Sequence, residues 1–299
     1  MNTAAQLFQP IHIGGVEVRN RIGMAPMAVF GLVSADGCFT RRAIDYYVER
    51  ARGGVGLIVT GYSEIENEVE VSLPGVVQNP SVHQPRFVAT AAELTERVHA
   101  HGARILLQLT LGLGRVGYEP WISGTPIAPS PVPAFWDPDV ACRAVGVEEI
   151  AALVRSAGEA ARTARLAGFD GVEIHALHEG YLLDQFLRSG SNLRTDTYGG
   201  SIENRARLLI EVMAAVTQEI GGDRVGLRLS PVTPANDAQD PHPQPLFEYV
   251  VTQLAPLKLA FVHIIEGSTG GPRDHVQGDT PFDYAALLRA YRKAGGGAA

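Results

Sequence analysis

Two hydrophobic patterns alternate along the chain. Short apolar and β-branched runs, typical of buried strands, are followed by longer stretches with apolar residues every three or four positions, as in amphipathic helices. Such alternation predicts repeated βα units and a parallel sheet. The predicted strands cover residues 21–27, 54–61, 104–110, 171–176, 224–231 and 261–267, and the predicted helices cover residues 40–53, 85–102, 146–168, 201–222, 244–257 and 281–295.

The order of these units favours a TIM-type (β/α) barrel. No Gly-x-Gly-x-x-Gly motif follows the first predicted strand, which disfavours an open dinucleotide-binding sheet. The pattern contains six βα units, whereas a complete barrel has eight. We therefore expect an α/β barrel domain with six of its eight units over residues 1–294, and a flexible Gly/Ala tail at 295–299.

Polar side chains are predicted inside this barrel. Because strand side chains alternate between the two faces of a sheet, Val172 and Ile174 would face the helices and His175 the interior. By the same argument Gln108 and Arg228 point inward near the carboxyl ends of their strands, where TIM-barrel active sites lie. Three such hydrogen-bonding groups indicate a polar ligand.

Structural roles remain open for the same residues. A single inward glutamine or arginine is often part of a structural pair, and a lone histidine is usually a satisfied core residue. Glu173 could pair with Arg228 inside the barrel. His263, on the last predicted strand, is expected to pack against helices.

Two connecting segments are longer than plain loops. Residues 115–146 are rich in proline and glycine and contain both tryptophans, so we expect an elaborated loop over a site. Residues 63–75 are acidic, and we expect them to form a solvated loop. Residues 237–245 contain acidic and histidine side chains, but their prolines and scattered spacing fit a solvated loop better than a metal site.

Composition excludes several classes of protein. With 45% apolar and 19% charged residues the chain is expected to be globular, and a net charge of −7 argues against a nucleic-acid surface. Two isolated cysteines make neither a disulfide framework nor a metal site. No signal peptide or membrane-spanning run is expected, and the cytoplasm is the predicted location.

Several motifs together point to one family. They include "NRIGMAPM" (20–27), "GGVGLIVTG" (53–61), "LLQLTLGLGR" (106–115) and "SNLRTDTYGGSIENRARLL" (191–209). With them, nearly the whole chain resembles the old yellow enzyme family, FMN-dependent NAD(P)H ene-reductases built on a TIM barrel. The resemblance implies FMN as cofactor, NAD(P)H as reductant and an enone-type small molecule as substrate.

The resemblance also implies which residues bind the flavin. Arg228 would lie near the N1 and C2 carbonyl edge of the ring, where negative charge gathers on reduction. Gln108 would hydrogen-bond the pyrimidine edge, and Gly61 would supply a backbone contact. The implied cofactor-binding residues are Pro26, Met27, Ala28, Gly61, Gln108 and Arg228.

Catalytic roles are implied in the same way. His175 and His178 would donate hydrogen bonds to the substrate carbonyl oxygen, and Tyr181 would protonate the α-carbon as general acid. Phe30 would line the substrate site where some members of the family have tyrosine.

Three further features depart from the family pattern. One extra residue separates His178 from Tyr181, which can shift a side chain by about 3 to 4 Å. Ala28 stands where the family often has threonine or cysteine near the flavin C4 carbonyl. The chain also ends before the expected seventh and eighth strands, whose loops bind the FMN phosphate in this family.

Three functions therefore remain open from the sequence. The leading hypothesis is an ene-reductase of activated C=C bonds. A second is a reductase of larger dienoyl thioesters or steroid enones, and a third is a non-catalytic or weakly flavin-binding barrel remnant. Open strand edges would favour a homo-oligomer.

Overall fold

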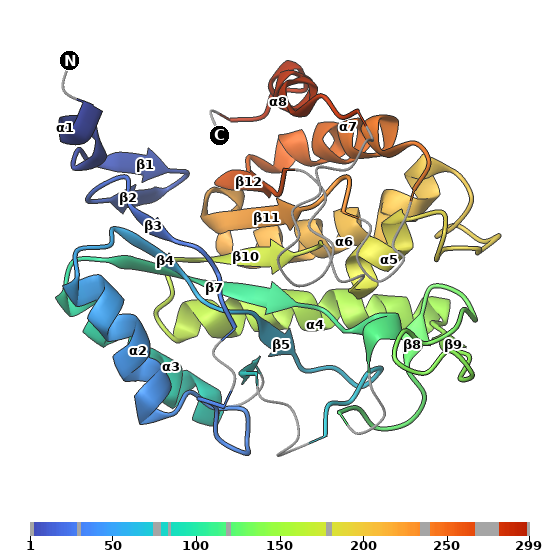
Figure 1. Cartoon of the computed structure of the whole chain (residues 1–299), viewed down its shortest axis with the longest axis horizontal. Helices are drawn as coiled ribbons and strands as arrows, with labels where there is room; N and C mark the ends of the chain where they lie inside the picture. Colours follow the sequence, from blue (N-terminus) through green and yellow to red (C-terminus); the bar gives the residue numbers. More distant parts are fainter. Residues whose placement is uncertain are drawn as a thin grey trace.

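A curved sheet of parallel strands forms the centre of the computed structural model (Figure 1). The structure describes residues 3–28, 31–73, 79–82, 85–117, 121–177, 181–233, 240–266 and 281–297. Neighbouring strands lie in the order β12, β11, β10, β7, β4 and β3, and each pairs in parallel with the next. Their bounds are β3 Gly23–Met24, β4 Leu57–Val59, β7 Arg104–Thr110, β10 Gly171–His175, β11 Val225–Leu229 and β12 Phe261–Ile264.

Helices connect these strands and pack side by side. Helix α2 contacts α3, α3 contacts α4, α4 contacts α6, α6 contacts α7, and α7 contacts α8. Two of these helices begin at a side-chain cap, since Thr40 accepts from the Ala43 N–H and Ser201 from the Asn204 N–H. The bounds are α2 Arg41–Arg52, α3 Pro85–Ala100, α4 Val147–Leu166, α6 Ile202–Ile220, α7 Pro243–Leu254 and α8 Tyr284–Lys293.

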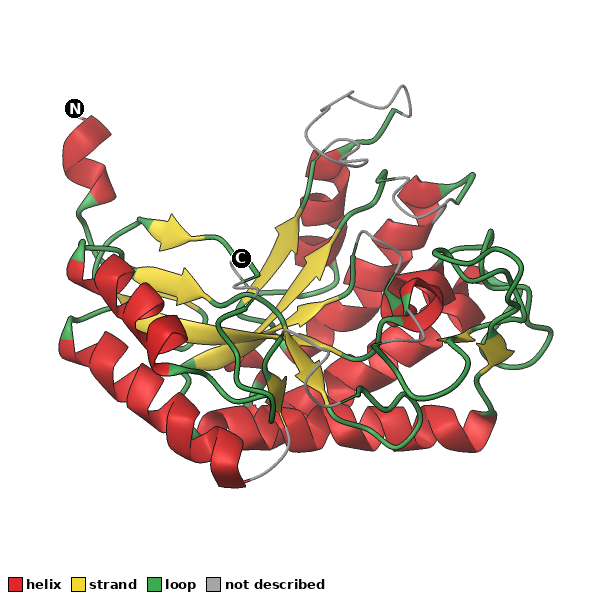
Figure 2. Cartoon of the chain, turned by 60° about the horizontal axis from the view of Figure 1, so that its bottom comes forward, coloured by secondary structure: helices red, strands yellow, loops and turns green. Residues whose placement is uncertain are grey.

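The helices cover the outer face of the curved sheet (Figure 2). The predicted alternation is confirmed on the covered face, where Val172, Ile174, Val225 and Leu227 are buried in the core shared with the helices. Burying such a side chain contributes roughly 1.5–3 kcal/mol, so this layer holds the strands in register. The opposite side chains of β10 and β11 are thereby fixed toward the interior.

An antiparallel hairpin that the sequence analysis did not predict precedes this sheet. It joins β1 (Ile11–Ile13) to β2 (Val16–Val18) through Gly14 and Gly15. Gly14 has a φ of +56°, and a Cβ there would lie 2.2 Å from the Asp223 carbonyl oxygen. The Gly15 N–H donates to that carbonyl at 2.8 Å, which ties the hairpin to the amino-terminal end of β11.

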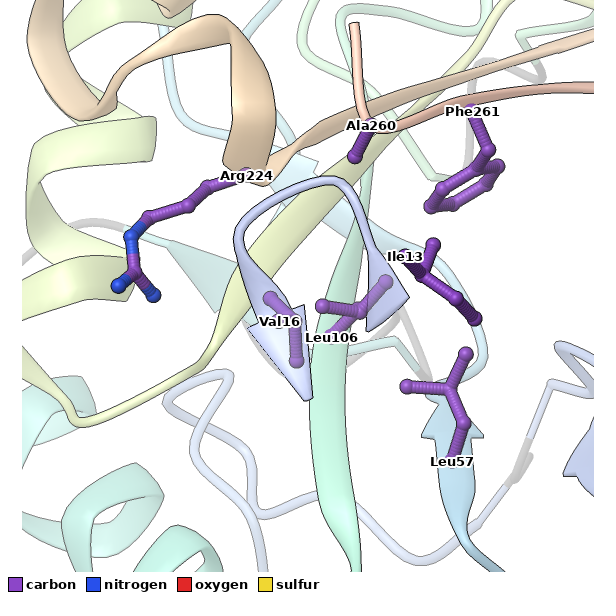
Figure 3. Close-up of a pocket in the computed structure, with 7 residues that line it drawn as sticks. All are labelled: Ile13, Val16, Leu57, Leu106, Arg224, Ala260 and Phe261. Atoms are coloured by element: carbon purple, nitrogen blue, oxygen red, sulfur yellow. The ribbon is translucent and has the colours of Figure 1, made fainter. Parts of the chain in front are cut away.

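A small apolar pocket lies at this amino-terminal end of the strands (Figure 3). The Arg224 guanidinium points away from it in Figure 3 and donates to the Asp170 carbonyl at 2.9 Å. The pocket therefore offers no polar group for chemistry and lies at the opposite end from the predicted site. It is lined by Ile13, Val16, Leu57, Leu106, Arg224, Ala260 and Phe261.

Several short elements lie in the connections. The predicted strands at 21–27 and 54–61 are longer than β3 and β4, because their flanking residues form loops instead of continuing the ladder. Additional elements are α1 Thr3–Leu7, β5 Ser63–Ile65, β6 Ser81–Val82, β8 Ile127–Ala128, β9 Arg143–Ala144, α5 Leu182–Leu187 and 3₁₀ turns at Gly114–Val116, Gly222–Arg224 and Ala255–Leu257.

Candidate functional site

Polar side chains meet on the concave face toward the carboxyl ends of four adjacent strands. Glu173 on β10 is in register with Gln108 on β7, His175 with Arg228 on β11, and Arg228 with His263 on β12. The predicted grouping of Gln108, His175 and Arg228 is therefore present. This end of a parallel α/β sheet is where ligands bind.

Glu173 has different partners from the predicted one. Its Oε2 accepts from Gln108 Nε2 at 2.5 Å, and its Oε1 lies 3.0 Å from His263 Nδ1. The suggested direct pairing with Arg228 is thus replaced by bonds to β7 and β12. The expectation that His263 packs against helices is wrong, because its ring points to the buried carboxylate on the concave face.

Arg228 has the properties of a ligand-binding cation. Its Nε is buried and has no hydrogen-bond partner within the described structure. Burial lowers the pKa of its guanidinium, and the charge of Glu173 partly opposes that effect. Burying a guanidinium whose N–H has no acceptor costs folding free energy, and a bound ligand that accepts from this N–H would offset the cost. This donor fits an electron-rich acceptor such as the ring edge of a flavin, the ligand that the family resemblance implies for Arg228.

The segment before α2 contacts the end of β4. A Cβ on Gly61 would lie 2.3 Å from the Met27 carbonyl oxygen and 2.8 Å from the Ala28 Cα, so only glycine permits this approach. The Gly61 N–H donates to the Tyr47 hydroxyl at 3.0 Å. A backbone contact from Gly61 to a ligand would therefore come from its carbonyl. Met27 and Ala28 thus lie against the end of β4 and Pro26 precedes them in the chain, while the contact of these three residues with FMN stays a prediction.

Three aromatic rings surround the end of β10. Tyr62 stacks on His175 with centroids 5.8 Å apart, and Tyr181 lies 5.1 Å from His175. Tyr181 is the N-cap residue of α5 and is 5% exposed. Despite the extra residue in the sequence, Tyr181 therefore remains beside His175. His178 and Phe30 lie outside the described residues.

The long segment over residues 115–146 contributes to this site, as expected. Ile122 packs with Leu113, Val116 and Tyr181 in a small apolar cluster, and Phe135 packs against the same cluster. These contacts exclude water from one side of the Tyr181 ring. They also hold the ring in place independently of its hydroxyl.

Tyr62 is a site residue that the sequence analysis missed. It directly follows Gly61 at the end of β4, and Asn79 Nδ2 donates to its hydroxyl at 2.9 Å. Its position at a strand end, on the same side of the sheet as His175, was the signal that could have identified it.

The acidic segment expected to be solvated at 63–75 is solvated only in part, because Glu66 and Glu68 are exposed whereas two other carboxylates are not. Glu64 and Glu70 are buried, and Glu70 accepts from the N–H groups of Leu113 and Gly114 at 2.6 and 2.8 Å. Burial raises the pKa of Glu70 to about 7, although these two bonds lower it. Glu70 therefore joins this segment to the loop that contacts Tyr181.

Stability is expected to fall as pH rises through the titration of Glu70. The folded-state pKa of about 7 exceeds the ordinary glutamate value of 4.5, so the folded chain holds the proton more tightly between these values. The free energy of unfolding is expected to fall by about 2.5 kcal/mol between pH 5 and pH 8. Urea unfolding at both pH values should give a steeper loss for the wild type than for Glu70→Gln. Equal slopes for the two proteins would contradict this assignment.

The described ranges contain neither a metal-binding cluster nor a helix that could span a membrane. No group of three or more His, Cys, Asp or Glu side chains there could hold a metal ion. No helix in the same ranges combines the length and apolar character needed to cross a membrane.

Comparison with known proteins identifies the family. Residues 6–286 match the model of the NADH:flavin oxidoreductase / NADH oxidase family. The chain is 48% identical to cinnamate reductase of Clostridium sporogenes over 225 residues, which are 75% of this chain but only 34% of that protein. It is 36% identical to chanoclavine-I aldehyde reductase of Penicillium roqueforti, covering 97% of this chain and 76% of the relative.

A solved structure gives the same result. The old yellow enzyme homologue from Zymomonas mobilis superposes with a TM-score of 0.81 at 33% identity, covering 97% of this chain and 79% of that one. The fold is accordingly an α/β TIM-type barrel. The chain belongs to the NADH:flavin oxidoreductase / NADH oxidase family, a family of FMN-dependent oxidoreductases that includes the old yellow enzymes.

Proposed function

We propose that this chain binds FMN at the carboxyl ends of its strands and reduces activated C=C bonds of α,β-unsaturated carbonyl compounds with NAD(P)H. The observation that carries the proposal is the buried Arg228 Nε, which has no hydrogen-bond partner among the described residues and lies on the same concave face as Gln108 and His175. The names of the relatives, a cinnamate reductase and an aldehyde reductase, support conjugated substrates.

In this proposal one group of residues binds the cofactor and another group binds the substrate. Arg228 and Gln108 would hold the pyrimidine edge of FMN, and Pro26–Ala28 with Gly61 would line the ring. Bound FMN would supply the hydride from its N5 atom. Placing a fixed cation where charge develops lowers the barrier without reorganisation during the reaction.

The substrate side is assigned to the polar groups around the end of β10. His175 and His178 would donate hydrogen bonds to the carbonyl oxygen, which withdraws electron density and makes the β-carbon a better hydride acceptor. Tyr181 would hold the proton for the α-carbon. The apolar contacts of Tyr181 with Leu113 and Ile122 support this role, because they fix the ring beside His175.

We further propose that residues 1–294 form a single barrel domain with six βα units. In the expected tail at 295–299, Gly295 and Gly296 donate to the carbonyls of Arg292 and Tyr291 at 3.0 and 2.9 Å, and residues 298–299 lie outside the described part of the chain. The support for the six-unit domain is the strand order, in which β3 and β12 are the end members of the parallel path. Such open edges favour self-association. Light scattering of the purified chain would test this, and a monomer at all concentrations would contradict it.

The visible spectrum of the purified protein tests the proposed function. Stoichiometric FMN, identified by mass after release, together with NAD(P)H oxidation that depends on an added enone, is the expected result. A protein that stays colourless after FMN is added would instead support the barrel remnant. Comparing a small enone with a dienoyl thioester and a steroid enone distinguishes the remaining substrate classes.

The midpoint potential of bound FMN is expected to rise in Ala28→Thr. Alanine offers no hydroxyl near the flavin C4 carbonyl, and a new donor there would stabilise the charge of the reduced ring more than the oxidised ring. One hydrogen bond is worth about 0.5–1.5 kcal/mol, or roughly 10–30 mV for a two-electron couple. Ala28→Val is the matched control, because it adds the same volume without a donor. A rise of equal size in both variants would contradict the explanation.

A further inference from the structure

Glu173 is the most deeply buried charged group at the candidate site. It is 0% exposed and lies on β10, two residues before His175. Its two oxygens are bound from opposite sides, one by Gln108 on β7 and the other by His263 on β12. A carboxylate is rarely buried this completely unless it is paired, so its retention in the interior requires a reason.

The first consequence concerns the orientation of Gln108. An ionised carboxylate can only accept hydrogen bonds, so the NH₂ group of the Gln108 amide must face Glu173 at 2.5 Å. The two ends of an amide are chemically different, and fixing one end fixes the other. The carbonyl oxygen of Gln108 is thereby the end left to accept from a ligand.

The second consequence concerns charge. Glu173 pairs in register with Gly226, two residues before Arg228 on the adjacent strand. The bonds of Glu173 go to Gln108 and His263, so its charge acts on Arg228 through space. In agreement, Glu173 raises the pKa of Arg228, against the larger lowering by burial. The negative charge therefore offsets part of the Arg228 charge that a ligand would feel.

We infer that Glu173 is a positioning residue of the flavin site, which turns the Gln108 carbonyl oxygen toward the pyrimidine N–H of FMN and moderates the Arg228 charge. This inference rests on the proposed function, because it requires FMN at these strand ends. Glu173 does not touch the cofactor in this scheme, since both its oxygens are already occupied.

Glu173→Gln tests the charge. The amide oxygen of the new side chain can still accept from Gln108. Its NH₂ group can donate to His263 Nδ1 when the imidazole proton is on Nε2. The geometry is therefore kept and only the charge is lost. Removing a negative charge near the site stabilises reduced FMN relative to oxidised FMN. We expect the ratio of the affinities for reduced and oxidised FMN to rise at least tenfold. This change raises the two-electron midpoint potential by about 30 mV. An unchanged potential would overturn the inference.

Glu173→Leu tests the orientation of Gln108. We expect the Kd for oxidised FMN, measured by quenching of flavin fluorescence, to rise at least tenfold. If Glu173 acts through Gln108, the double variant Glu173→Leu/Gln108→Leu should bind FMN as well as Gln108→Leu alone, within about twofold. Additive losses in this cycle would overturn the inference. Thermal unfolding without FMN shows whether each variant is folded, and Glu173→Gln carries the test if Glu173→Leu is not.

Asp170→Asn provides the matched control. Asp170 precedes the amino-terminal end of the same strand and accepts from His99 and the Ile105 N–H, both at 2.8 Å. Its replacement should lower stability and leave the FMN potential unchanged. A potential shift as large as that of Glu173→Gln would overturn the inference. The wild-type spectrum separates this inference from the proposed function. A wild type that binds no FMN contradicts both. A wild type that binds FMN, together with an unchanged midpoint potential in Glu173→Gln, contradicts only the role of Glu173.

Discussion

Replacing Tyr181 by phenylalanine is expected to slow the oxidation of reduced enzyme by an enone roughly 10²- to 10⁴-fold, the usual contribution of a positioned general acid. The ring should stay in place, because it is 5% exposed and packs against Leu113, Val116 and Ile122. Only the hydroxyl is lost. Reduction of FMN by NAD(P)H requires no proton on a substrate carbon, so its rate should change little.

Stopped-flow measurement of the two half-reactions separates these effects. Tyr62→Phe is the matched control, since the Tyr62 ring lies 5.7 Å from that of Tyr181 and its hydroxyl already accepts from Asn79. We expect less than a threefold effect there, compared with the roughly 10²-fold or greater loss in Tyr181→Phe. If Tyr62→Phe slows enone reduction more than Tyr181→Phe, the proton donor is misassigned.

The sheet was predictable because its determinants are local. The predicted strand at 104–110 has the observed bounds of β7, and the alternation within 171–176 placed Glu173 and His175 on the correct face. Thr40 and Ser201, the first residues of two predicted helix ranges, are the N-caps of α2 and α6. Strand alternation and helix capping act over a few residues, so one sequence is enough to show them.

Contacts between distant residues were not predictable in the same way. His263 was assigned to the helix face because the run 261–265 is apolar on both faces and gives no clear alternation. Its partner Glu173 lies 90 residues earlier. Glu70 looked solvated because its neighbours are acidic, yet its two donors are backbone N–H groups 43 and 44 residues away. The hairpin at 11–18 could have been predicted from its Gly-Gly turn.

The chemical roles of the site residues were predicted from family motifs, and not from the alternation of side chains along the strands. Alternation alone placed Gln108, His175 and Arg228 on one face and left structural pairing open. The structure adds an unused Arg228 Nε and the carboxylate that occupies Gln108, and neither can be read from sequence spacing. The buried carboxylate explains why these strand ends hold a defined arrangement of donors before any cofactor binds.

Replacing Arg188 by methionine is expected to cost about 3–5 kcal/mol of unfolding free energy, the usual effect of breaking a buried ion pair. Arg188 is 1% exposed, and its guanidinium lies 2.9 Å from the Asp184 carboxylate on α5. It also donates to the carbonyls of Ser230 and Pro231 at 2.7 and 2.9 Å. This one side chain therefore joins the segment that begins at Tyr181 to the loop after β11.

Such a loss lowers the melting temperature by on the order of 10 °C in a chain of this size. The loss should be larger at pH 8 than at pH 5. Burial already raises the pKa of Asp184, and removal of Arg188 raises it further, so at low pH the carboxyl takes up a proton and the unpaired charge disappears. Thermal unfolding at both pH values measures this difference.

Arg162→Met is the matched control. Arg162 makes two bonds of 2.8 Å to Glu219, but its side chain is 56% exposed, so we expect a cost below about 1 kcal/mol. Asp184→Leu/Arg188→Met should regain much of the stability lost in Arg188→Met, because no charge remains buried without a partner. If the double variant is less stable than Arg188→Met, the cost lies in packing against Phe247 and in the two carbonyls rather than in the uncompensated Asp184 charge.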